Sequence, residues 1–263
     1  MTYCIFTDLR HYDVKSGTQT SPSDDNETLG NIHDIYFDDD TWAIKWFVVE
    51  TGHWYSSNKI LLDSKYFTQV SPATRTFHVS ISKADIENAP SVDEHHPVGE
   101  QRKSELLYTS FGQDTLFFPG YSGVLMPQTL IERSAVLAEQ EMDKQEADVS
   151  DADYADRHLR SASEILGYTV SAINGELGPV TDLVINTDQW NITLLALDTS
   201  KWLPDRTVVI TPESIERISW EESKLFVTMS KQTIEKSPQL CDLKAIKTSY
   251  VSTLSDYYLY PMM

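Results

Sequence analysis

The chain contains the same stretch of sequence twice, and this duplication constrains its fold more than any other feature. A displacement of 148 positions aligns residues 29–90 with residues 177–238 without a gap. Fifteen of the 62 aligned positions are identical, whereas roughly one in fifteen would agree by chance at typical residue frequencies. The identical pairs include Trp42 with Trp190 and Trp54 with Trp202. We therefore expect two domains of the same fold.

Composition supports globular domains and excludes some classes of partner. The 263 residues are 40% hydrophobic, which is enough for two ordinary cores. Lys and Arg number 21 against 40 Asp and Glu, so the formal net charge at pH 7 is -19. Because nucleic acids and anionic membrane surfaces are bound through clustered basic residues, we expect neither as a partner. An acidic protein can instead attract a basic protein.

The sequence predicts a protein of the cytoplasm without a disulfide framework. Residues 1–14 lack a basic segment followed by an apolar run, so no signal peptide is expected. No stretch reaches the roughly 20 apolar residues of a membrane span. The two cysteines, Cys4 and Cys241, lie far apart in sequence, and neither a disulfide framework nor a Cys-based metal site follows from them.

One predicted strand in each copy is apolar on both faces. In the first copy Ile44, Trp46 and Val48 lie on one face, with Phe47 and Val49 on the other. In the second copy the two faces are formed by Ile192, Leu194 and Ala196 and by Leu195 and Leu197. Such a strand must be covered on both sides. One cover would be a barrel interior, and the other a helix, the sister domain or another subunit.

Further short extended runs predict small barrels. Residues 59–62, 66–70 and 77–81 correspond to residues 207–210, 215–220 and 225–229. Many short strands separated by turns favour a closed barrel, which removes exposed sheet edges. In the second copy Asn174 and Gly175 stand between two apolar runs, which is a strong hairpin signal.

Both copies then change to a helical pattern. Residues 82–85 fit a capping box at the start of a short helix, with Ile86 as an early inward residue. A second helix is expected within residues 99–111, from Leu106, Leu107 and Phe111. Val251, Leu254 and Tyr258 predict a related helix at the end of the chain.

The sequence thus predicts a mainly β fold of two homologous small antiparallel β-barrels, each followed by short helices. The first domain would span residues 1–111 and the second residues 157–263. Residues 112–156 have no counterpart, and their acidic end favours an irregular connector.

Short motifs in the second copy carry a family resemblance. They are G-Y-x-V at 167–170, G-E-L-G-x-V-x-D-L at 175–183 and D-T-x-x-W-L at 198–203. With them the chain resembles tandem bacterial proteins of the PRC-barrel family, named after the barrel of the photosynthetic reaction centre H subunit. The first copy retains L-G-x-I-x-D-I at 29–35 but departs from the pattern at 55–57. The resemblance implies a small antiparallel barrel used for assembly or docking, and it implies no catalytic residue.

Acidic and histidine clusters are candidate metal ligands, each with a plainer alternative. Carboxylates at Asp38, Asp39 and Asp40 could hold a hard cation, but their spacing does not fit an EF-hand loop, and we favour a solvated turn. His95 and His96 are neighbours that would point in opposite directions on an extended chain, and no third ligand is identifiable. The last cluster, Asp148, Asp151, Asp153 and Asp156, fits exposed linker charge.

Two sets of equivalent residues offer a catalytic or ligand-binding interpretation. Asp34 and Asp182 would be an acid–base pair, but an Asp beside a hairpin more often holds backbone amides. The repeated Trp residues would stack on a ligand, but packing in the core or between the domains is favoured. The G-x-S-x-G element and the nucleotide-binding glycine patterns are absent. We therefore predict no catalytic, cofactor-binding or metal-ligating residue.

These observations favour a non-catalytic protein-interaction or assembly module without a cofactor. Its partner would be another protein or a second copy in a homodimer, with neither nucleic acid nor a membrane span involved. The alternative is a sensor that binds a small ligand or metal in a cleft between the barrels, near Trp54 and Trp202. An enzyme and an RNA-linked assembly factor are weaker hypotheses.

Overall fold

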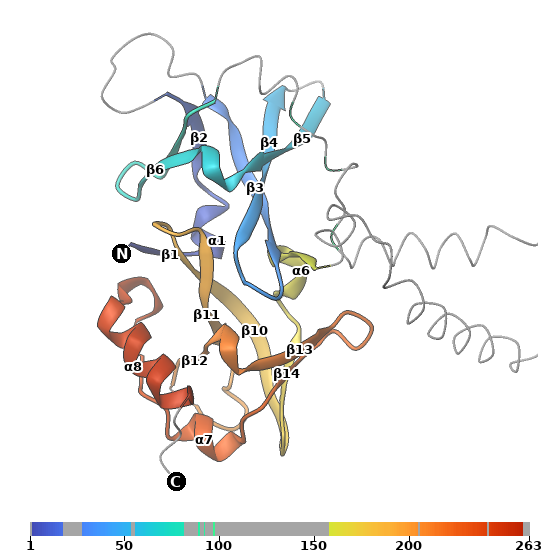
Figure 1. Ribbon diagram of the computed structural model, residues 1–263, viewed down its shortest axis with the longest axis vertical. Helices are drawn as coiled ribbons and strands as arrows, with labels where there is room; N and C mark the ends of the chain where they lie inside the picture. The colour runs from blue at the N-terminus through green and yellow to red at the C-terminus, as the bar shows by residue number, and fades with distance from the viewer. Residues whose placement is uncertain are drawn as a thin grey trace, which may run out of the picture.

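The molecule consists of two halves stacked along its longest axis (Figure 1). The computed structural model describes residues 2–17, 28–53, 56–81, 89, 92, 97, 158–204, 206–240 and 242–259. We call residues 2–81 the first half and residues 158–259 the second half. The predicted helix at 99–111 and the connector at 112–156 lie outside the described residues.

Each half repeats the same succession of strands. The first half contains β1 (Tyr3–Ile5), α1 (Phe6–Leu9), β2 (Asp13–Ser16), β3 (Thr28–Asp38), β4 (Ile44–His53), β5 (Ser56–Asp63), the 3-10 helix η1 (Ser64–Tyr66), β6 (Phe67–Ser71) and β7 (Thr76–Val79). The second half contains β8 (Leu159–Ser161), α6 (Ala162–Ile165), β9 (Thr169–Ala172), β10 (Gly175–Asn186), β11 (Asn191–Leu197), β12 (Val208–Ile210), η2 (Pro212–Ser214), β13 (Ile215–Ser219), β14 (Lys224–Val227), α7 (Lys231–Glu235), η3 (Leu243–Ala245) and α8 (Thr248–Leu259). The protein is therefore mainly β, as the sequence predicts.

Two sheets of equivalent strand order form the fold. One follows the order β5-β4-β3-β2-β7-β6 and the other β12-β11-β10-β9-β14-β13. The expectation of purely antiparallel sheets is wrong, because β2 pairs with β7 and β9 pairs with β14 in parallel. The reason lies in η1 and η2, which join successive strands without a hairpin reversal. Within the described residues no pairing joins the two ends of either path, so neither sheet closes by hydrogen bonds.

The strands predicted to be apolar on both faces are covered on both sides, but Ile44 lies in the main core with Phe47 and not on the face of Val48, because the strand register shifts beside it. Phe47 and Val49 are fully buried in the main core, and on the opposite face Val48 is 1% exposed. Val48 belongs to a second, smaller cluster with Tyr36, Leu61 and Leu159, against which Trp46 and Val92 pack. In the second half the equivalent strand, β11, buries Leu194, Leu195 and Ala196 in the main core.

The C-terminal helices follow the predicted pattern. The hydroxyl of Ser230 accepts a hydrogen bond from the amide of Thr233 at 3.2 Å, which caps α7, and Ile234 is buried. Helix α8 buries Leu254 and Tyr258, and the Tyr258 hydroxyl donates to the carbonyl of Val209 at 2.9 Å. The capping box at 82–85 lies outside the described residues. No helix in the described part of the chain is long and apolar enough to cross a membrane.

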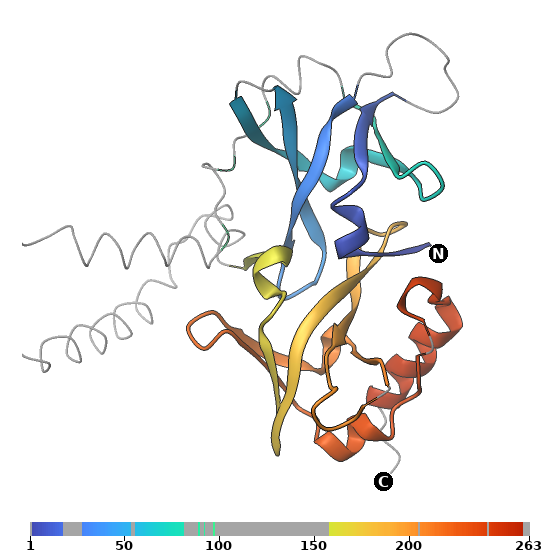
Figure 2. The same cartoon turned by 180° about the vertical axis from the view of Figure 1, so that it is seen from behind.

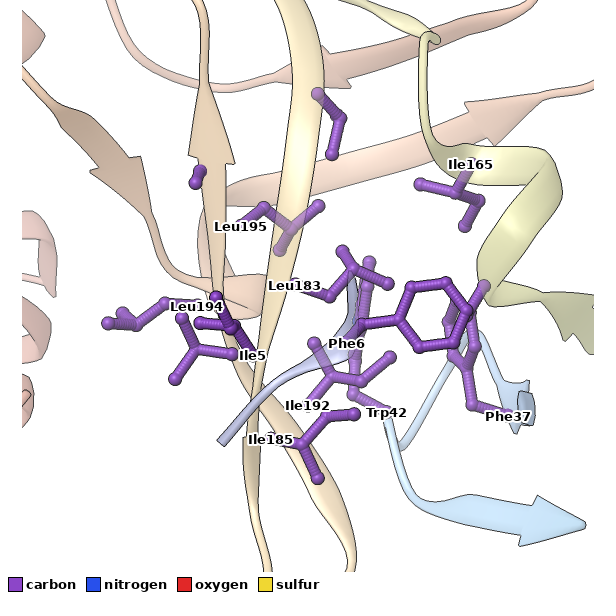
Figure 3. Packing of buried hydrophobic residues seen from close by; sticks show 14 of the residues in the cluster. Ile5, Phe6, Phe37, Trp42, Ile165, Leu183, Ile185, Ile192, Leu194 and Leu195 are labelled. Carbon is purple, nitrogen blue, oxygen red and sulfur yellow. The ribbon is translucent and has the colours of Figure 1, made fainter. Parts of the chain in front are cut away.

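A single main core runs through both halves. Figure 3 shows Ile5, Phe6, Phe37 and Trp42 from the first half gathered with residues of β10, β11 and α6 from the second. The labelled second-half residues are Ile165, Leu183, Ile185, Ile192, Leu194 and Leu195. The boundary between the two copies therefore passes through one continuous apolar interior.

Candidate functional site

The two halves meet at a junction where each gives its first strand to the other. β1 pairs antiparallel with β10, so Tyr3 lies opposite Asn186 and Ile5 opposite Val184. β8 pairs antiparallel with β3 in the same way. Figures 1 and 2 show that β1 and α1 lie at one lateral end of the junction and α6 at the opposite end. We call β1 with α1, and β8 with α6, the two arms.

Apolar side chains fix each arm in place. In the first arm Phe6 and Leu9 are fully buried, and in the second arm Ala162 and Ile165 are exposed by no more than 1%. Each short helix follows its strand directly, so its apolar residues turn back into the main core. Burial of a large aliphatic or aromatic side chain stabilises a fold by about 1.5–3 kcal/mol. The arms are thus anchored by packing as well as by strand pairing.

Asp34 receives the second arm. Its carboxylate accepts hydrogen bonds from the Ser161 hydroxyl at 2.6 Å and from the Ser163 amide at 2.9 Å. A third bond comes from the amide of Ile35 at 2.8 Å. Burial raises the pKa of Asp34 above its usual value, although these hydrogen bonds act in the opposite direction. The side chain therefore holds the start of α6, which belongs to the other half.

Asp182 receives the first arm in the same manner. Its carboxylate accepts hydrogen bonds from the amide and the hydroxyl of Thr7 and from the amide of Leu183. The two aspartates thus face different arms, and each is engaged by backbone amides. Asp34 and Asp182 hold backbone amides, as the favoured interpretation predicts. In addition, each accepts hydrogen bonds from an arm of the other half. Local sequence offers no signal for that addition.

The turns that contain Trp42 and Trp190 pair with each other across the junction. The amide of Ile44 donates to the carbonyl of Trp190 at 2.7 Å, and that of Ile192 donates to the carbonyl of Trp42 at 2.9 Å. Both Trp residues have a positive φ, 57° and 52° respectively. Two equivalent turns therefore form one small antiparallel bridge, in which Ala43 lies opposite Asn191.

The Trp190 ring enters the core of the first half. Its centroid lies 5.0 Å from that of Phe47, 5.8 Å from Phe67 and 5.9 Å from Phe77. The indole N–H donates to the carbonyl of Phe67 at 3.3 Å. Trp42 stacks on Phe37, with a centroid separation of 5.2 Å. Trp190 thus packs between the halves and Trp42 packs in the core, as the favoured interpretation predicts.

The acidic run at 38–40 divides into three different roles. Asp38 accepts hydrogen bonds from the amide and hydroxyl of Thr41, both at 2.8 Å. Partial burial acts to raise the pKa of Asp38, but these bonds and nearby Lys45 outweigh burial and lower it. Asp39 instead binds the second half, and Asp40 is exposed. In the described ranges no three His, Cys, Asp or Glu residues are placed to hold a metal ion.

The ion pairs of Asp39 are a part of the junction that sequence reasoning missed. Its carboxylate lies 2.8 Å from Nδ1 of His158 and 2.5 Å from Nε of Arg160, and Asp39 is 12% exposed. The equivalent residue in the second half is Thr187, whose amide and hydroxyl both donate to the carbonyl of Thr2. The charged contact is therefore specific to one end of the junction.

The residues of the predicted ligand cleft are only partly described. The indole N–H of Trp202 donates to the carbonyl of Leu177 at 2.5 Å, and the Lys231 ammonium lies 5.4 Å from the ring centroid. These partners all belong to the second half. Trp54, His95, His96, Cys241 and the Asp cluster at 148–156 lie outside the described residues. The Cys4 thiol is free, and burial raises its pKa to about 11.

A polar ladder on the first half was also missed by sequence reasoning. Nζ of Lys59 lies 2.8 Å from Nε2 of His33, and Nδ1 of His33 lies 3.6 Å from the Glu50 carboxylate. These side chains come from β5, β3 and β4. The equivalent residues in the second half are Thr207, Thr181 and Asp198. The outer surfaces of the two halves therefore carry different chemistry at these three positions.

The junction joins the two halves of the chain through strand pairing, through hydrogen bonds from backbone amides to buried carboxylates, and through aromatic packing. No protein-family model matches the chain, and no curated protein is found to match it.

Proposed function

We propose that this protein is a non-catalytic interaction or assembly module made of two PRC-barrel-like halves. The observation that carries the proposal is the reciprocal exchange of arms, in which β1 joins β10 and β8 joins β3. Addition of a strand to a sheet edge is a common mode of protein recognition. This fold uses that mode twice within one chain. Asp34 and Asp182, the carboxylates most open to a catalytic interpretation, serve the same recognition.

The barrel part of the proposal is supported by the way each sheet curls. β5 and β6 lie at opposite ends of one strand path, yet only the three residues of η1 separate them in the chain. Phe67 on β6 packs on Phe47 of β4, with ring centroids 4.0 Å apart. The ends of the path are thus brought around a common interior, as in a partly open barrel. The motif at 175–183 supports the family resemblance.

We propose a protein as the external partner, recognised by the outer surfaces of the halves. The net charge of -19 favours a partner with a basic surface. The two outer surfaces offer different chemistry: Lys59, His33 and Glu50 on the first half, and Arg217 over the ring of Phe226 on the second. The guanidinium carbon of Arg217 lies 3.7 Å from that ring centroid.

Affinity capture with the tagged full-length chain, followed by cross-linking and mass spectrometry, tests the proposal. We expect a reproducible protein partner whose cross-links fall on the outer surface of one half. Glu50→Lys on the first half and Glu222→Lys, beside Arg217 on the second, reverse exposed carboxylates that a basic partner would contact, so each serves as the control for the other. A partner bound through one surface should be lost with one variant only. Capture of no protein, together with a monomeric mass by light scattering, would refute the proposed function.

A further inference from the structure

The junction has the reciprocal form of an interface between two subunits. Each half gives an arm and receives one: α1 is held by Asp182 of the second half, and α6 by Asp34 of the first. The contacts of one half on the other are therefore repeated in the opposite direction. In a twofold symmetric dimer, the same surface patch likewise meets itself.

The pairing of the two turns completes this symmetry. Ala43 lies opposite Asn191, and the hydrogen bonds that flank this pair join residue 44 to 190 and residue 192 to 42. Ala43 and Asn191 thus form a non-hydrogen-bonded antiparallel pair, whose Cα atoms are typically about 4.5 Å apart. All three contact sets, the two arms and the turn bridge, are formed between one first half and one second half.

The covalent connection does not decide which halves must meet. Residues 82–157 join the halves, and a chain of 76 residues spans at most about 250–270 Å when extended. The first half of a chain can by length alone reach the second half of its own chain or that of a neighbour. Every contact of the junction is the same in the two arrangements.

We propose that two copies of this chain exchange halves, so that the first half of each copy pairs with the second half of the other. The resulting dimer contains two complete junctions and leaves no arm unpaired. This inference rests on the proposed assembly function and names one partner, a second copy of the chain. The exchange of identical elements is a known low-cost route to dimers.

Single cysteines at the turn bridge provide a direct test. In a full-length background carrying Cys4→Ser and Cys241→Ser, Ala43→Cys is introduced into one chain and Asn191→Cys into another. The expected Cα separation lies within the range that a disulfide bridges. Neither variant alone can form a 43–191 disulfide. In the mixture this bond forms only when the first half of one chain meets the second half of the other.

The mixture is unfolded and refolded together at increasing chain concentration, oxidised, and analysed without reductant. We expect a disulfide-linked species of twice the 29.9 kDa chain mass, containing the 43–191 bond by peptide mapping, in an amount that rises with concentration. The matched control carries both cysteines in one chain: it stays at the monomer mass where the halves meet within a chain, and it links two chains where they exchange. Internal closure of the control without any 43–191 cross-link in the mixture would overturn the inference.

A second measurement covers the case in which the engineered disulfide does not form. Isotopically light and heavy chains without substitutions are refolded together and examined by native mass spectrometry and light scattering. A mixed dimer is the expected result, and a strictly monomeric mass at every concentration would overturn the inference. Capture of a different protein by the outer surfaces would be unaffected, so this failure is separable from failure of the proposed function.

Discussion

The two halves fill equivalent core positions with different kinds of side chain. In the first half Phe47, Phe67 and Phe77 form an aromatic cluster, with centroids between 4.0 and 6.1 Å apart. The equivalent residues in the second half are aliphatic, namely Leu195, Ile215 and Leu225. Both sets support the same strand order. The comparison teaches that the alternation of apolar positions determines this topology, while the choice among apolar residues adjusts its packing.

Several of the identical residues lie at turns and at the junction. Asp34 and Asp182 hold the arms, and Trp42 and Trp190 form the turn bridge. Gly30 and Gly178 occupy matching places where two backbones come close together. These positions require a particular backbone conformation or a particular polar group, which most other residues do not provide. Four predictions test this division between fixed and adjustable positions.

The largest effect is expected where a glycine permits close approach of two strands. A Cβ on Gly178 would lie 1.8 Å from the carbonyl oxygen of Asp198, and one on Gly30 would lie 2.1 Å from that of Glu50. Their φ values are +144° and +156°. We expect Gly30→Ala and Gly178→Ala each to lower the free energy of unfolding by more than about 4 kcal/mol. Urea denaturation followed by Trp fluorescence measures it.

Gly167→Ala is the matched control for the two glycine variants. Gly167 also has a positive φ, +92°, but a Cβ there would meet nothing within 4 Å. Only the conformational penalty of about 1–2 kcal/mol should remain. An equal loss in all three variants would show that φ, and not the close approach, makes these positions fixed.

The next effect distinguishes the aromatic half from the aliphatic half. Trp190→Leu removes contacts with three Phe rings and the hydrogen bond to Phe67, and we expect a loss of about 2–4 kcal/mol. Trp42→Leu removes one stacking contact, with Phe37, and should cost at least about 1 kcal/mol less. Thermal and urea unfolding of the two variants give the comparison. A smaller loss for Trp190→Leu would show that the aromatic cluster does not depend on the second half.

The two aspartates should be nearly equivalent in a third comparison. Asp34→Ala and Asp182→Ala each leave amides of the junction without an acceptor, and we expect about 2–3 kcal/mol of destabilisation for each. The Asn variants keep one acceptor oxygen and should lose less than half as much. Urea unfolding of the four variants measures these differences. Destabilisation by Asn equal to that by Ala would show that the negative charge, and not the acceptor, holds the arms.

The smallest effect is a dependence on pH that belongs to Asp34. Burial raises the pKa of Asp34 above the usual value of 3.8, so the folded protein keeps this proton at a pH where the unfolded chain has released it. Its contribution to stability is present below the unfolded pKa and is lost as pH rises through the folded pKa. The slope is at most about 1.4 kcal/mol per pH unit.

This slope is isolated by comparison with an Asn variant, because many other carboxyl groups titrate in the same window. The difference in unfolding free energy between the natural chain and Asp34→Asn should decrease as pH rises from about 4. A difference that stays constant across this pH range would contradict the assignment to Asp34.

The local features of the fold could be predicted from sequence, because they depend on neighbouring residues. The hairpin at Asn174 and Gly175, the C-terminal helix that buries Leu254 and Tyr258, and the amide-binding role of Asp182 are of this kind. The parallel strand pairs could not be predicted. They depend on η1 and η2, each three residues long, which join two strands without reversing the direction of the chain. The exchange of arms left no local pattern either, because β1 and β8 are three residues long and pair with distant strands.

The exchange of arms also orders events during synthesis of the chain. The end of β3, residues 36–38, lacks its partner strand β8 until residues 159–161 have left the ribosome. Tyr3 likewise has no partner until Asn186 has been made. At 5–20 residues per second, the N-terminal arm therefore waits roughly 10–40 s for its partner strand. During that interval its apolar residues and the unpaired edge of β3 are exposed to other chains. A nascent chain of this protein thus completes its first half only after strands β8, β9 and β10 of its second half have been made.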